Sequence, residues 1–120
     1  MAVIESRDHS NFVHTLKLDW ATSATTGTVT HTTDKFINGL IERVSIKPDT
    51  TAAPTTAYNV VMRDDRNTDV LKGGGAGCYS SVNKEVYLSP AMPVDSKLAL
   101  TVGAAGTSNA GSIVIFWRES

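Results

Sequence analysis

The feature that most constrains the fold is an alternation of side chains with a period of two. In the segment FVHTLKLDW, residues 12–20, one face carries every second residue, namely Phe12, His14, Leu16, Leu18 and Trp20. The other face is mainly polar. Successive side chains of a β-strand point to opposite faces, so this pattern predicts a half-buried strand.

Similar signals recur along the chain and are separated by turn residues. Further strands are predicted over residues 24–33, 39–47, 57–63, 85–89, 97–102 and 112–118. For the segment 39–47, a short helix around residues 36–42 is the alternative, because Leu40 and Val44 also fit a spacing of four. Pro90 and Pro93 are expected to end the strand 85–89. Both faces of 112–118 are apolar, which predicts a central strand.

Smaller features refine these predicted strands. Gly27 marks a bulge or turn within 24–33. The inward face of 57–63 is predicted to carry Tyr58, Val60 and Met62, and that of 97–102 to carry Leu98, Leu100 and Val102. The polar stretch DDRNTD, residues 64–69, reads as a hairpin turn that leads into VLK.

Composition agrees with a fold made only of strands. Threonine and other β-branched residues are abundant, and glutamine is absent. A chain of 120 residues fits one domain. We therefore predict an all-β, single-domain β-sandwich or jelly-roll-like barrel over residues 12–120, preceded by an extended N-terminal arm over residues 1–11.

Charge and cysteine content narrow the classes of function. The net charge of −1 gives no reason to expect nucleic acid or a membrane surface as a partner. Cys78 is the only cysteine, which suits a protein that folds in a reducing cytosol. The opening MAVIESRDHSNF lacks the apolar core of a signal peptide. We expect a product made in the cytoplasm.

The glycine-rich stretch DVLKGGGAGCYSS, residues 69–81, raises the question of a phosphate-binding loop. A Walker-type loop needs a lysine after its last glycine, whereas Lys72 precedes Gly73 and Cys78 follows Gly77. A dinucleotide loop needs a helix after it, and the following CYSSVNKEVYL has no helix signature. We interpret the stretch as a flexible connection that tolerates positive φ.

Metal and catalytic signals are weak. His9, His14 and His31 are far apart in the sequence, and DRNTD lacks the later glycine and glutamate of a calcium loop. Cys78 is a candidate nucleophile, but no local signature supports it, and a small buried or loop thiol is the simpler interpretation. We predict no enzymatic activity, no catalytic residues, no metal and no cofactor.

From residue 39 onward the order of features resembles a known group of proteins. The pattern is GLIERVSIKPD, a Pro/Thr/Ala loop, AYNVVMRDDRNTDVLKGGGAG and finally KLALTVGAAGTSNAGSIVIFWR. It is similar to small β-rich structural proteins of tailed-phage virions, of the capsid decoration or cement type. The resemblance implies a virion protein that binds the assembled head lattice and stabilises it. It implies the major capsid protein or other virion proteins as partners, and a homo-oligomer, most simply a trimer.

Two segments are predicted to carry the interface. In the arm, Val3 and Ile4 are expected to anchor a strand that pairs with a neighbouring subunit. The second segment contributes Gly73, Gly74, Gly75 and Tyr79, which is expected to be exposed because it lies next to the glycines. A carbohydrate- or receptor-binding module that uses Tyr79 is one alternative function, and a small tail or fibre component of the virion is another. A small hydrolase or isomerase on a β-barrel is a third.

Overall fold

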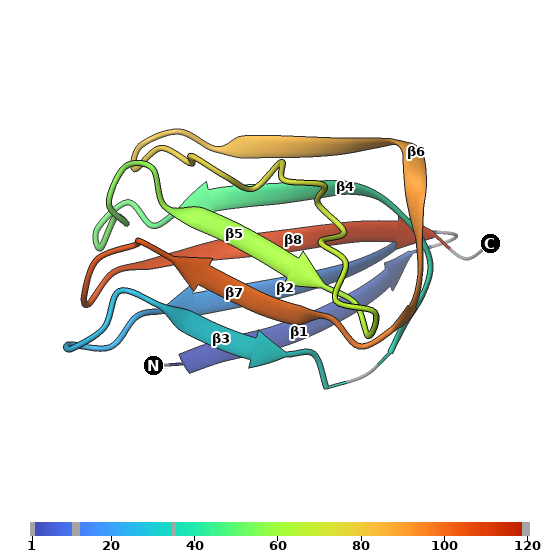
Figure 1. The fold of residues 1–120 in the computed structure, drawn as a ribbon, viewed down its shortest axis with the longest axis horizontal. Helices are drawn as coiled ribbons and strands as arrows, with labels where there is room; N and C mark the ends of the chain where they lie inside the picture. Colours follow the sequence, from blue (N-terminus) through green and yellow to red (C-terminus); the bar gives the residue numbers. More distant parts are fainter. Residues whose placement is uncertain (1, 11–12, 35, 119–120) are drawn as a thin grey trace.

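The computed structural model describes residues 2–10, 13–34 and 36–118, which form an all-β fold (Figure 1). Its strands are β1 (Ala2–Ser10), β2 (Val13–Ala21), β3 (Val29–Thr32), β4 (Ile37–Pro48), β5 (Asn59–Arg63), β6 (Lys84–Ser96), β7 (Ala99–Gly103) and β8 (Ala110–Arg118). Within these described residues, no helix has the length and apolar character to cross a membrane.

The strands form two antiparallel sheets. One sheet has five strands in the order β1-β2-β8-β4-β6, and the other has three in the order β3-β7-β5. In Figure 1 the three-stranded sheet lies in front of the larger one. The predicted all-β class is confirmed, and the two sheets are compatible with a β-sandwich.

The pairing of strands is nested. β2 pairs with β8, β3 with β7, and β4 with β6, so the first half of the chain meets the second half in reverse order. The chain reverses after β5, where isolated bridges join Tyr58 to Cys78 and Arg63 to Asp69. The segment 69–78 therefore runs beside β5, although it is too irregular to count as a strand.

The core lies between the sheets and uses the predicted inward faces. The residues that were predicted to face inward and are fully or almost fully buried are Leu16, Leu18, Trp20, Tyr58, Val60, Met62, Leu98, Leu100 and Val102. β8 lies between β2 and β4, which confirms that it is a central strand. Phe12, expected on the same face as Leu16, lies outside the described residues.

β4 is a strand throughout, so the helical alternative around residues 36–42 is wrong. The apolar pattern of this segment did not distinguish a strand from a helix, because Glu42 interrupts the alternation. The register of β4 against both β6 and β8 shifts between Ile41 and Arg43. This irregularity lets Ile41 and Val44 both face the core, which an ideal strand would forbid at that spacing.

β6 continues through Pro90 and Pro93, so the prediction that these prolines end the strand is wrong. The physical reason is its position, because an edge strand pairs on one side only and tolerates residues without an N–H group. Opposite Pro93 in the register stands Leu40 of β4. Figure 1 shows that β6 turns a corner and crosses the end of the molecule.

The predicted strand over residues 24–33 is shorter than expected. Only Val29–Thr32 form β3, and the preceding residues form a loop in which the Ser23 hydroxyl accepts hydrogen bonds from the amides of Thr25 and Thr26. Gly27 lies in this loop, where an added Cβ would stand 2.9 Å from the Gly106 nitrogen. Polar side chains that bond to nearby backbone compete with sheet pairing here.

The predicted arm is a strand of the five-stranded sheet. Residues Ala2–Ser10 form β1, which pairs with β2 in unbroken register from Ala2 opposite Ala21 to Ser10 opposite Val13. The boundary placed at residue 11 falls on residues outside the described part of the chain. β1 is extended, but its backbone is engaged along one side within its own molecule.

Candidate functional site

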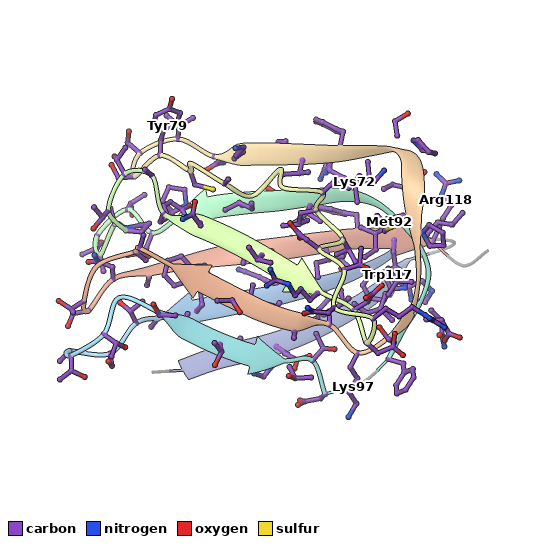
Figure 2. All side chains as sticks on the ribbon, in the orientation of Figure 1. Lys72, Tyr79, Met92, Lys97, Trp117 and Arg118 are labelled. Carbon is purple, nitrogen blue, oxygen red and sulfur yellow. The ribbon has the colours of Figure 1, made fainter. Side chains whose placement is uncertain are left out.

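The predicted interface residues lie in separate parts of the molecule, with Val3 and Ile4 on an edge strand of the larger sheet and Gly73–Gly75 in the segment beside β5 of the smaller one. Val3 and Ile4 belong to β1, which forms one edge. A Cβ added at Gly74 would stand 2.8 Å from Val86 of β6, which forms the other edge. Figure 2 shows Tyr79 projecting outward from a corner of the molecule. The structure therefore does not unite these residues in one patch.

The edge at β1 is open. Val3 packs against the core, whereas Ile4 points away from it and is 66% exposed. Among the described residues no strand pairs with the far side of β1, and the segment 2–10 contains no proline. An edge strand presents a row of unpaired N–H and C=O groups, so β1 offers a template for another strand.

Two other edges are obstructed. Pro90 and Pro93 remove donors from the edge strand β6. The outer side of β5 is occupied by the segment 69–78, where the Val70 amide donates to the Met62 carbonyl over 2.7 Å. Unlike β6 and β5, the edge strand β1 contains no proline, and no other segment covers it in the described structure.

The glycine-rich segment is tied into the fold by its own amides. The Gly73 amide donates to Asp69 Oδ2 over 2.9 Å, and the Gly77 amide donates to Asn59 Oδ1 over 3.0 Å. The Gly74 amide donates to the Leu71 carbonyl over 2.8 Å. These three donors are therefore engaged rather than directed at a ligand. Gly73 and Gly77 have positive φ, as expected for this segment.

The carboxylates of the DRNTD region cap turns. Asp64 Oδ1 accepts hydrogen bonds from the amides of Arg66 and Thr68. Asp69 accepts from the amides of Leu71 and Gly73. Asx caps of this kind stabilise tight turns. The geometry agrees with the interpretation of this stretch as a polar turn.

Cys78 is a buried free thiol, as the simpler interpretation predicted. Its Sγ lies 3.3 Å from the Gly75 carbonyl oxygen, to which it donates. Burial raises the pKa of the Cys78 thiol, and the nearby Lys84 opposes this effect only in part. A raised pKa keeps sulfur in its less nucleophilic protonated form.

On the outer face of the larger sheet, three side chains from neighbouring strands form a row that was not predicted from the sequence. The register aligns Phe116 of β8 with Arg43 of β4, and Arg43 with Tyr87 of β6. The Arg43 guanidinium stacks on the Phe116 ring, and Tyr87 is 68% exposed. The residues are distant in sequence, so only the pairing of strands brings them together.

A second unpredicted cluster joins the two sheets beside β1. Glu5 Oε2 lies 2.5 Å from His31 Nε2 and accepts a 2.9 Å hydrogen bond from the Asp34 amide. The Glu5 side chain is only 9% exposed and that of His31 is 23% exposed. His31 was considered as a metal ligand from the sequence, but Glu5 and Asp34 were not associated with it.

A shallow hollow is lined in part by the residues that follow Tyr79 in the sequence. Its volume is about 310 Å³, and its lining combines Lys47, Pro48, Asp49 and Thr50 with Ala53, Ser80, Ser81 and Asn83. Hydroxyl, amide and charged groups line it together with apolar surface. Apolar surface makes up the larger part of the lining, and the polar groups are a minority that could orient a ligand.

The chain was compared with protein-family models, with curated proteins and with solved structures. None of the three comparisons gives a match.

Proposed function

We propose that this chain is a jelly-roll structural protein of a phage virion, with no enzymatic role. The nested pairing of β2 with β8, β3 with β7 and β4 with β6 supports the jelly-roll topology. The segment 69–78 beside β5 takes the place of a further strand. Double-sheet jelly rolls occur in viral capsid and lectin domains. A shared fold alone does not assign a function, so the surface must carry the argument.

The observation that carries the proposal is the open edge of β1. This strand has exposed Ile4 on its outer face and no proline in residues 2–10. β-Strand addition at such an edge supplies main-chain hydrogen bonds, and neighbouring side-chain pockets supply specificity. We propose that a strand of the major capsid protein or another virion protein adds here, and that the subunits form trimers.

Decoration of the head stabilises it by mass action. A protein that binds the assembled lattice and not its free subunits shifts the equilibrium toward the assembled state. The proposed site of action is therefore the virion, after synthesis in the host cytoplasm. The row formed by Phe116, Arg43 and Tyr87 offers a second contact surface on the same sheet.

Binding to phage heads that lack this protein tests the proposal. Purified protein is mixed with such heads, and bound protein is separated by sedimentation. We expect saturable binding with a dissociation constant of about 1 μM or lower, as is typical of specific assembly contacts. Absence of binding at micromolar concentration contradicts the assignment to a head and leaves a tail or fibre role to be tested with tails.

A pair of variants locates the contact. Ile4→Lys places a charge beside the open edge and should abolish binding, whereas Thr107→Lys, in the exposed turn before β8, should leave it unchanged. Light scattering coupled to size exclusion measures the oligomeric state of all three proteins. Equal binding by the two variants would show that β1 is not the contact.

A carbohydrate- or receptor-binding role is the second candidate, and it is favoured by a hollow lined in part by Ser80 and Ser81, the residues that follow Tyr79. Tyr79 is 62% exposed and adjoins Ser80 and Ser81 of the lining. Aromatic rings with adjacent hydroxyl and amide groups suit sugar recognition, because one part is apolar and the other forms hydrogen bonds. A glycan-array signal that Tyr79→Ala abolishes would favour this role, and a blank array would count against it.

A further inference from the structure

The cluster of Glu5, His31 and Asp34 is the best-built group of metal-ligating side chains among the described residues. Each offers one ligand atom, and these atoms all lie within 4.8 Å of one another. Glu5 comes from β1, and His31 and Asp34 come from β3 and the turn after it. We propose that this cluster binds a divalent transition metal of the zinc class and thereby fastens β1 to β3.

The donor set selects the class of metal. Imidazole nitrogen suits Zn²⁺ and its transition-metal neighbours, whereas Ca²⁺ and Mg²⁺ prefer sites made only of oxygen. One histidine with two carboxylates supplies three protein ligands, which leaves a position for water on the exposed side of Asp34. The site therefore resembles an open coordination site more than a closed structural one.

The distances require only a small rearrangement. Tetrahedral ligand atoms at roughly 2.0–2.2 Å from zinc stand roughly 3.3–3.6 Å apart. The His31 Nε2 and Glu5 Oε2 atoms are closer than this, at 2.5 Å, and the whole set lies within 4.8 Å. Metal binding separates the first pair by about 1 Å and replaces their direct contact with two bonds to the ion.

The proposed site lies between two edge strands, so a bound ion would connect them. β1 and β3 are edge strands of different sheets, and the described contact between His31 and Glu5 bridges them. Glu5 is already held by the Asp34 amide, which restricts its carboxylate before any ion arrives. Preorganised ligands bind with a smaller entropic cost. A bound ion would therefore fasten the edge strand β1 of one sheet to the edge strand β3 of the other.

Calorimetric titration of metal-free protein with ZnCl₂ tests the proposal, with CaCl₂ as the comparison. We expect one Zn²⁺ per chain, weaker binding of Ca²⁺ and a zinc-dependent rise in the unfolding temperature. Zinc should also slow hydrogen exchange of the β1 amides. No zinc binding at millimolar concentration, or preference for Ca²⁺, overturns the proposal.

Single variants identify the ligands. Glu5→Gln, His31→Gln and Asp34→Asn should each weaken zinc binding by at least about tenfold. Asp34 is exposed, so Asp34→Asn tests the site even if the other two variants fail to fold. An unchanged affinity in Asp34→Asn contradicts the three-ligand site.

Two matched variants control for adventitious binding. His14→Gln removes a different histidine, whose ring stacks on Trp117, and Asp19→Asn removes a half-exposed carboxylate of β2 that pairs only with Lys17 at 3.7 Å among the described contacts. Both should keep the wild-type affinity for zinc. A loss in either variant as large as that in His31→Gln would refute the assignment. The experiment contains no heads, so its failure leaves the proposed decoration role untouched.

Discussion

Arg43 lies over the ring of Phe116, with its guanidinium carbon 3.9 Å from the ring centroid. The two residues stand opposite each other on the central strands β4 and β8. Arg43 Nε is also 3.5 Å from Glu85 Oε1 on β6, an ion-pair separation without hydrogen-bond geometry. The stack thus links three strands on the outer face of the larger sheet.

A double-mutant cycle should measure this stack. Arg43→Met keeps a long side chain without charge, and Phe116→Leu keeps an apolar side chain without the ring. We expect a coupling free energy of about 0.5–1 kcal/mol between the two positions, because the pair is partly exposed. Urea unfolding of the wild type, both single variants and the double variant gives this value. Additive effects would mean that the stack contributes no stability.

Gly75→Ala should destabilise the protein strongly. An added Cβ would stand 2.1 Å from the Val60 carbonyl oxygen, so the backbone beside β5 must move. We expect a loss of about 2–3 kcal/mol in the free energy of unfolding. Gly103→Ala is the matched control, since its Cβ meets nothing within 4 Å, and its effect should stay within about 0.5 kcal/mol. Similar values for the two variants would contradict the close approach.

Tyr58→Phe should leave stability unchanged or raise it by about 1 kcal/mol. The Tyr58 hydroxyl is buried and has no hydrogen-bond partner among the described residues. A buried polar group without a partner costs free energy on folding, and phenylalanine keeps the ring that packs against Trp20. Thermal and urea unfolding check the effect. A loss above 1 kcal/mol would reveal a partner for the hydroxyl.

The sequence is sufficient to predict strands whose faces differ clearly. Leu16, Leu18 and Trp20 alternate with polar residues, and this local period determines which side meets the core. The prediction that Pro90 and Pro93 end their strand was wrong because a proline interrupts a central strand but is tolerated in an edge strand. Whether a strand lies at an edge depends on pairing with strands that are distant in the sequence. The strand itself was visible in the sequence, whereas its place in the sheet was not.

The candidate site was less accessible to sequence reasoning for the same reason. Glu5 and His31 meet only because β1 and β3 lie at neighbouring edges of different sheets. Nothing in the local pattern around either residue encodes that meeting. The outward position of Tyr79, in contrast, was predicted from its place beside the glycines and is confirmed by its exposure.

The stability of the protein should fall at alkaline pH because of Tyr58 and Cys78. Burial raises the pKa of both groups from their ordinary values of 10.0 and 9.0, and for Tyr58 the charge of Cys78 adds to the effect. The folded chain keeps both protons at a pH where the unfolded chain has lost them. The unfolded state then binds fewer protons, so the free energy of unfolding decreases as pH rises above about 9.

The double variant Tyr58→Phe, Cys78→Ala isolates this contribution. Each group that stays protonated only in the folded state adds a slope of up to about 1.4 kcal/mol per pH unit. Urea unfolding between about pH 8 and pH 10.5 should therefore show a steeper decline for the wild type than for the variant. Lysines and exposed tyrosines are common to both proteins and cancel in the comparison. Parallel declines would mean that Tyr58 and Cys78 ionise in the folded state as readily as in the unfolded chain.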